Sequence, residues 1–138
     1  MLHAVEKSRV LIVDDERVIA ETLVSIFHHS GYEARCVFSA EDALNLIPQW
    51  TPSLAVIDVL LPEMNGVDLA IRIRAEYPGI RVTLFSGHTA TAELLEAARQ
   101  QGHEFNILAK PVHPADLLDL ASNLLAAPAA GRINSDGN

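Results

Sequence analysis

The feature that most constrains the fold is a fivefold alternation of short apolar runs with longer amphipathic segments. Apolar runs of this length predict strands covered on both faces, as in a parallel sheet. The expected strands are Arg9–Val13, Tyr32–Phe38, Leu54–Asp58, Arg81–Phe85 and Phe105–Leu108. The expected helices are Glu16–His29, a helix capped by Ser39, Val67–Glu76, Thr91–Gln101 and Pro114–Leu125. The alternation predicts an α/β fold, a doubly wound parallel sheet with helices on both faces.

Turn and capping residues support these boundaries. Gly31 follows the first amphipathic segment, where a glycine commonly ends a helix. Ser39 precedes the second, and Asp42 stands three positions later, which is typical of a capped helix start. Pro48 and Pro52 bracket the loop before the third strand.

The chain of 138 residues has the length of one domain. We expect an N-terminal extension over residues 1–8, a folded domain over residues 9–125 and a flexible C-terminal tail over residues 126–138. The tail is rich in small, polar and helix-breaking residues, and cannot bury enough apolar surface to order itself.

Charge and cysteine content exclude several functional classes. The net charge of −8 argues against direct nucleic-acid binding and against binding to an anionic membrane, since both need clustered Lys and Arg. The single cysteine, Cys36, rules out an internal disulfide framework. The N-terminus does not have the pattern of a signal peptide. We therefore expect a cytoplasmic protein.

Polar residues gather where the expected strands end. Asp14 and Asp15 follow the first strand, Asp58 ends the third, Ser86 follows the fourth and Lys110 follows the fifth. Ligand sites of open parallel sheets form beyond the carboxyl ends of the strands. We therefore expect these side chains to form one site.

Three neighbouring carboxylates repel one another unless a cation binds between them. Mg²⁺ prefers oxygen ligands, so Asp15 and Asp58 are the expected direct ligands, with Asp14 binding directly or through water. Lys110 supplies a positive charge and Ser86 a hydroxyl donor. This combination suits phosphoryl transfer to a carboxylate nucleophile.

Over residues 9–125 the chain resembles the response-regulator receiver domains of bacterial two-component signalling. The matching pieces are Val10–Glu16 (VLIVDDE), Ile57-Asp58, Pro62, Gly66, Ser86-Gly87 and Lys110-Pro111. The resemblance implies a flavodoxin-like (βα)5 fold with strand order 2-1-3-4-5. It implies that Asp58 accepts a phosphoryl group from a sensor histidine kinase or a histidine phosphotransfer protein.

The resemblance also assigns roles to the other residues. Asp14, Asp15 and Asp58, with the backbone carbonyl of Leu60, would bind Mg²⁺, and Ser86 and Lys110 would contact the phosphoryl group. Such a domain is a signalling module that catalyses only its own phosphorylation and dephosphorylation. Relatives bind partners, and also form dimers, through their last two helices and the strand between them. The kinase, the output partner and any fused output domain cannot be named from the sequence.

The chain departs from the family pattern before Lys110. Receiver domains usually carry an aromatic switch residue three positions before this lysine, where this chain has Ile107. The nearest aromatic residue is Phe105. This departure leaves open a second reading, a receiver-like interaction domain that acts without phosphorylation.

Two other functions fit less well. A small Mg²⁺-dependent phosphatase that forms an aspartyl phosphate usually has a second acid two residues after the nucleophile, where this chain has Leu60. A mononucleotide or flavin binder needs a glycine-rich phosphate loop after the first strand, where this chain has Asp14-Asp15-Glu16.

Overall fold

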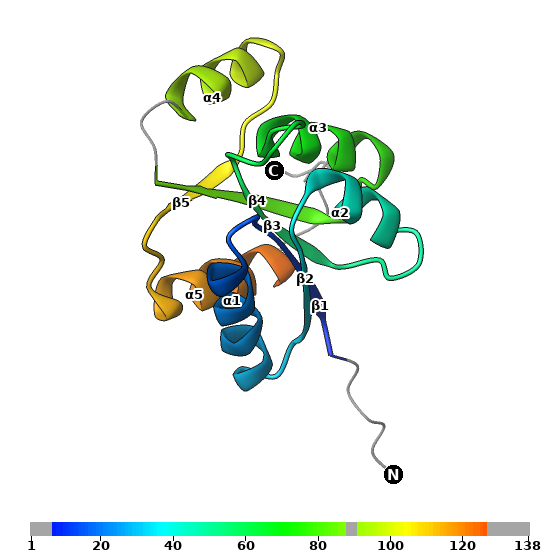
Figure 1. The fold of residues 1–138 in the computed structure, drawn as a ribbon, viewed down its shortest axis with the longest axis vertical. Helices are drawn as coiled ribbons and strands as arrows, with labels where there is room; N and C mark the ends of the chain where they lie inside the picture. Colours follow the sequence, from blue (N-terminus) through cyan, green and yellow to red (C-terminus); the bar gives the residue numbers. More distant parts are fainter. Residues whose placement is uncertain (1–6, 88–90, 127–138) are drawn as a thin grey trace, which may run out of the picture.

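The computed structural model describes residues 7–87 and 91–126, which form a five-stranded parallel sheet between two layers of helices (Figure 1). The strands are β1 (Arg9–Val13), β2 (Glu33–Val37), β3 (Leu54–Asp58), β4 (Arg81–Ser86) and β5 (Asn106–Ala109). The helices are α1 (Arg17–His29), α2 (Ala40–Leu46), α3 (Gly66–Glu76), α4 (Thr91–Gln100) and α5 (Pro114–Ala126). The predicted extension over residues 1–8 and tail over residues 126–138 lie almost wholly outside the described residues.

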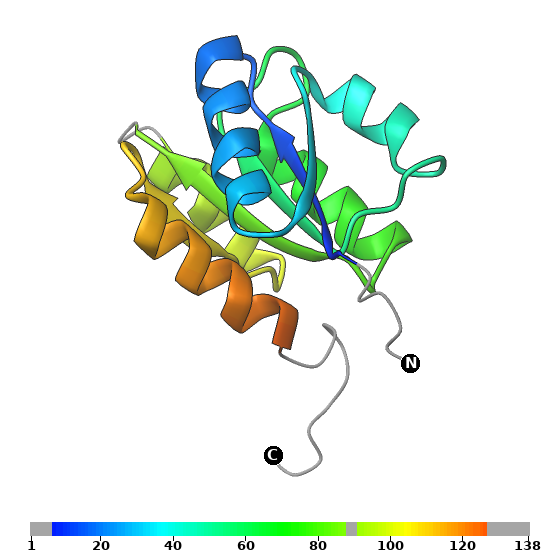
Figure 2. The same cartoon turned by 90° about the horizontal axis from the view of Figure 1, so that it is seen from below.

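The strand order is β2-β1-β3-β4-β5, and every neighbouring pair is parallel. The predicted fold class and strand order are therefore confirmed. Helices α1 and α5 lie on one face of the sheet, and α2, α3 and α4 lie on the other (Figures 1 and 2). The central strands β1 and β3 are thus covered on both sides, which explains their unbroken apolar sequence.

Side chains of β1 alternate between the two halves of the core. Val10 and Ile12 pack in the cluster that includes α1 and α5, whereas Leu11 and Val13 pack in the cluster that includes α2 and α3. This is the period of two that a strand imposes on its side chains. All four residues are fully buried, so β1 is held in register from both faces.

The local signals in the sequence also hold. Asp42 N–H donates a hydrogen bond of 3.1 Å to Ser39 Oγ, the predicted cap of α2. Gly31 lies two residues after the last residue of α1 and has a φ of +94°, a backbone conformation that favours glycine. Each predicted element end coincides with the observed one or differs from it by one residue; α3, for example, begins at Gly66 rather than Val67.

None of the helices within residues 7–87 and 91–126 is both long enough and apolar enough to cross a bilayer.

Candidate functional site

Three of the residues predicted from the sequence meet at the carboxyl edge of the sheet. Asp14 directly follows β1, Asp58 is the last residue of β3, and Lys110 directly follows β5. Lys110 Nζ lies 3.1 Å from Asp58 Oδ2 and 3.3 Å from Asp14 Oδ2. The sheet therefore brings two carboxylates and an ammonium group together from three different strands.

Backbone hydrogen bonds orient the two carboxylates. Asp14 is fully buried, and its Oδ1 accepts a hydrogen bond of 2.9 Å from the Glu16 amide. Asp58 is 5% exposed, and its Oδ1 accepts a hydrogen bond of 3.2 Å from the Leu60 amide. In each residue the other oxygen is the one that faces Lys110. The turns after β1 and β3 thus fix how both carboxylates point.

Gly66 closes the turn after Asp58. Its amide donates a hydrogen bond of 2.7 Å to the Val59 carbonyl. A Cβ atom at position 66 would overlap the backbone carbonyl of Asp58. Only glycine fits this close approach, so the first residue of α3 presses directly on the end of β3.

Lys110 is held at both ends. Its amide donates a hydrogen bond of 3.0 Å to the Ser86 carbonyl, which joins β5 to β4, and its peptide bond to Pro111 is cis. Its Nζ lies 4.8 Å from the centroid of the Phe85 ring. The aliphatic part of the side chain runs past Gly87, where an added Cβ would meet Lys110 Cβ. The ammonium group is thereby aimed across the sheet edge toward Asp58.

The charges of the site alter its acid–base behaviour. Burial raises the pKa of Asp14 to about 6; the charge of Asp58 adds to this rise, whereas the Glu16 amide and Lys110 oppose it. Burial by itself lowers the pKa of Lys110, but its hydrogen bond to Asp58 and the charges of Asp58 and Asp14 outweigh burial, and the pKa is raised. Lys110 is therefore charged throughout the physiological range.

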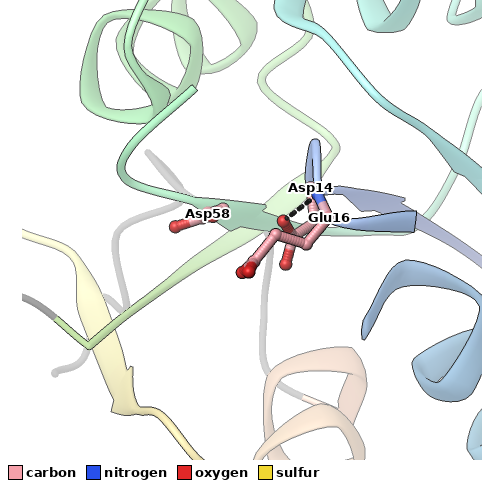
Figure 3. A group of neighbouring side chains, drawn as sticks. All are labelled: Asp14, Glu16 and Asp58. Atoms are coloured by element: carbon pink, nitrogen blue, oxygen red, sulfur yellow. Dashed lines mark hydrogen bonds between the residues drawn. The ribbon is translucent and has the colours of Figure 1, made fainter. Parts of the chain in front are cut away.

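The acidic group has the composition of a site for a hard cation. Carboxylate oxygens of Asp14, Glu16 and Asp58 lie within 4.8 Å of one another (Figure 3). Asp14 Oδ2 is buried and accepts no well-aligned hydrogen bond from any described residue; its contact is the ion pair with Lys110. A buried anionic oxygen with spare lone pairs, next to two further carboxylates, fits Mg²⁺.

Glu16 is the member of this group that sequence reasoning missed. Its Oε1 lies 3.4 Å from Lys110 Nζ, and its side chain is 61% exposed. The acidic run Asp14-Asp15-Glu16 held the signal, but the sequence does not show which of the three carboxylates point into the site. Asp15 is exposed and is not part of the group. Its role as a direct metal ligand stays a prediction.

The other predicted residues lie at the same edge. Ser86 ends β4, is half-buried and pairs with Ala109 of β5. Leu60 is half-buried directly after Val59, and its amide donates a hydrogen bond to Asp58 Oδ1. The hydroxyl role of Ser86 and the metal-binding role of the Leu60 carbonyl stay predictions.

The segment before Lys110 differs from an aromatic switch. Ile107 is 45% exposed on the edge strand β5. Phe105 is half-buried between two other side chains: the Arg74 guanidinium lies 4.1 Å from its ring centroid, and the His103 ring stacks on it at 6.3 Å. Arg74 also donates a hydrogen bond of 3.0 Å to the Glu104 carbonyl. The Phe105 ring is thus held against α3 by its contact with Arg74.

Comparison with known proteins decides the family. The family model of the response regulator receiver domain matches residues 10–122, which include every site residue described above. The chain is a response regulator receiver domain. The receiver domain has the CheY-like, flavodoxin-like fold in full, with its acidic residues and lysine at the expected edge of the sheet.

Curated relatives are longer proteins. The response regulator protein FleR of Pseudomonas aeruginosa is 36% identical over 115 residues, which cover 83% of this chain and 24% of FleR. The DNA-binding response regulator MtrA of Mycobacterium tuberculosis is 26% identical over 112 residues, which cover 81% of this chain and 48% of MtrA. The receiver domain thus spans between a quarter and a half of these relatives.

Solved structures give the same result. The CheY-like receiver domain protein of Methanospirillum hungatei superposes with a TM-score of 0.78 at 28% identity, covering 87% of this chain and 94% of that one. A putative response regulator from Chloroflexus aurantiacus gives a TM-score of 0.77 at 31% identity, covering 88% of this chain and all of the other.

Proposed function

We propose that this receiver domain accepts a phosphoryl group on Asp58 and thereby switches its binding to a partner. The observation that carries the proposal is the contact of 3.1 Å between Lys110 Nζ and Asp58 Oδ2 beside the group formed by Asp14, Glu16 and Asp58. An oxygen of Asp58 attacks the phosphorus atom, the bond from phosphorus to the donor breaks, and the leaving group takes that bonding pair.

The chain's own residues prepare Asp58 for this step. The Leu60 amide fixes one oxygen of the carboxylate, and Lys110 can move from Asp58 to a phosphoryl oxygen, where its charge opposes the charge of the transferred group. Ser86, at the end of the neighbouring strand, would donate its hydroxyl to the same group.

Mg²⁺ is the cofactor that the residues fit. Asp14 and Asp58, together with Asp15 or Glu16 and the Leu60 carbonyl, would hold the ion. When bound, Mg²⁺ would supply positive charge that neutralises the oxygens of the transferred group.

A sensor histidine kinase or a histidine phosphotransfer protein is the proposed phosphoryl donor, in keeping with the family. The response is proposed to pass to a partner protein, to a fused output domain or to a second copy through α4, β5 and α5. That face is proposed from the family, and Ile107 of β5 is 45% exposed on it. The domain would act as a signalling module and not as a metabolic enzyme.

Incubation with acetyl phosphate and Mg²⁺, followed by intact mass measurement, tests the proposal. We expect the gain of one phosphoryl group in the wild type and in Asp119→Asn, an exposed carboxylate on α5. The isosteric variant Asp58→Asn is expected to gain none. A wild type that stays unmodified would instead favour an interaction domain that works without phosphorylation, the reading that Ile107 leaves open.

A further inference from the structure

The Glu16 side chain does not cap α1. Glu16 is the residue before α1, where a side-chain oxygen often caps the helix, yet no amide of α1 donates a capping hydrogen bond to the Glu16 side chain. Its carboxylate instead reaches over the site to Lys110, at 3.4 Å. Figure 3 shows Glu16 and Asp14 leaving the end of β1 on the side where Asp58 ends β3.

The three carboxylates around Lys110 differ in their burial. Asp14 and Asp58 are buried, whereas the Glu16 side chain is 61% exposed. A carboxylate oxygen of Glu16 lies within 4.8 Å of one of Asp58, so a phosphodonor that reaches Asp58 comes close to the charge of Glu16. Glu16 also draws Lys110, the one described cation within ion-pair distance of Asp58.

We propose that Glu16 is a specificity-determining residue that makes the site discriminate between phosphodonors by their charge. The inference rests on the proposed phosphorylation of Asp58 and adds to it. A dianionic donor is disfavoured relative to a donor of lower negative charge, because Glu16 repels each negative charge near Asp58 and holds part of the compensating charge of Lys110.

Coulomb's law sets the size of the effect. We take a separation of about 7 Å between the Glu16 carboxylate and the charge of the phosphodonor, a water-like dielectric and low ionic strength. Under these conditions one fixed negative charge slows the reaction of a dianionic donor about fivefold and that of a monoanionic donor about twofold. At about 1 M salt the Debye length is about 3 Å, so both factors fall close to one. Dependence on donor charge and on salt distinguishes this role from a structural one.

Two small donors make the comparison possible. With acetyl phosphate, a dianion at neutral pH, the phosphorus–oxygen bond breaks and acetate leaves with the bonding pair. With phosphoramidate, a zwitterion of net single negative charge, the phosphorus–nitrogen bond breaks and ammonia leaves with the bonding pair. In both reactions a carboxylate oxygen of Asp58 forms the new bond to phosphorus, so the product is the same.

The experiment measures initial rates of phosphoryl gain by intact mass for the wild type and for Glu16→Gln. Both donors are used at low and at high salt, with Mg²⁺ saturating for each protein. Glu21→Gln is the matched control, since Glu21 is an exposed carboxylate of α1 that pairs with Arg17. Thermal unfolding of each variant checks that the fold is unchanged.

We expect Glu16→Gln to react about fivefold faster than the wild type with acetyl phosphate and about twofold faster with phosphoramidate at low salt. Both gains should vanish at high salt, and Glu21→Gln should match the wild type. Equal acceleration with both donors, an acceleration that survives high salt, or no acceleration would overturn the role of Glu16. A wild type that gains no phosphoryl group from either donor would instead overturn the proposed function.

Discussion

Lys110 Nζ and Asp58 Oδ2 lie 3.1 Å apart although the two residues are 52 positions apart in the chain. The contact spans the end of the sheet from β5 to β3, with β4 between them. It balances part of the negative charge that Asp14 and Asp58 bring into a buried region.

Loss of the Lys110 ammonium group should lower the stability of the fold. In Lys110→Met the aliphatic length is kept and the ammonium is lost, so two buried carboxylates lose their cation. Without Mg²⁺ we expect a loss of about 1–3 kcal/mol in the free energy of unfolding near pH 8. Urea unfolding followed by the fluorescence of Trp50, the only tryptophan and a buried one, measures this loss. An unchanged midpoint would show that the ion pairs contribute nothing.

Asp14 should make the apoprotein less stable as pH rises. Its pKa is raised to about 6 in the folded state, so between its unfolded value of 3.8 and about 6 the folded protein binds more protons than the unfolded chain. Stability contributed by the protonated group is therefore lost across this window, and the penalty is complete above pH 6.

The variant Asp14→Asn removes that penalty. With a chelator present, we expect it to be more stable than the wild type by about 1–3 kcal/mol at pH 7.5, and equal to it near pH 4. Denaturant midpoints measured across this pH range make the comparison. A difference that does not depend on pH would contradict the assigned ionisation.

Gly66 couples the site to α3. Gly66→Ala places a methyl group against the backbone carbonyl of Asp58, so the turn must move. We expect a loss of about 1–3 kcal/mol in stability and slower phosphoryl gain. Gly79→Ala is the matched control, because no described atom lies within 4 Å of the added Cβ. Similar stability in the two variants would show that the turn adapts freely.

Arg74 should hold the α4–β5 connection against α3. Arg74→Ala removes the hydrogen bond to the Glu104 carbonyl and the cation–π contact with Phe105. We expect a stability loss of about 1 kcal/mol and faster hydrogen exchange in β5.

Arg72→Ala provides the control for Arg74. Arg72 is an exposed neighbour on α3 that forms only a surface pair with Glu76 among the described contacts. We expect Arg72→Ala to lower the free energy of unfolding by less than about 0.5 kcal/mol. Equal exchange rates in β5 for the two variants would contradict the anchoring role of Arg74.

The sequence predicts the sheet and the core of the site for a physical reason. A parallel sheet places the carboxyl ends of all its strands at one edge. Asp14, Asp58 and Lys110 were therefore expected to be neighbours once their strands were recognised. The turn signals at Gly31 and Ser39 locate helix ends because each depends on a local conformation or hydrogen bond.

The sequence does not predict the direction in which side chains point after a strand has ended. The alternation that orients residues along β1 stops at Val13, and a hydrogen bond from the Glu16 amide to Asp14 then sets which acids face inward. Glu16 therefore could not be distinguished from Asp15 in advance. Exposure of Ile107 follows from the position of β5 at the sheet edge, which an apolar run does not reveal.

Chemical trapping of the phosphorylated residue tests the central claim most directly. An aspartyl phosphate is an acyl phosphate, which borohydride reduces to homoserine, whereas a free carboxylate is left unchanged. After treatment with acetyl phosphate, Mg²⁺ and borohydride, peptide sequencing by mass spectrometry should find homoserine at position 58 and aspartate at positions 14 and 15. Homoserine at another position, or aspartate retained at position 58 in protein that has gained a phosphoryl group, would contradict the assignment of Asp58.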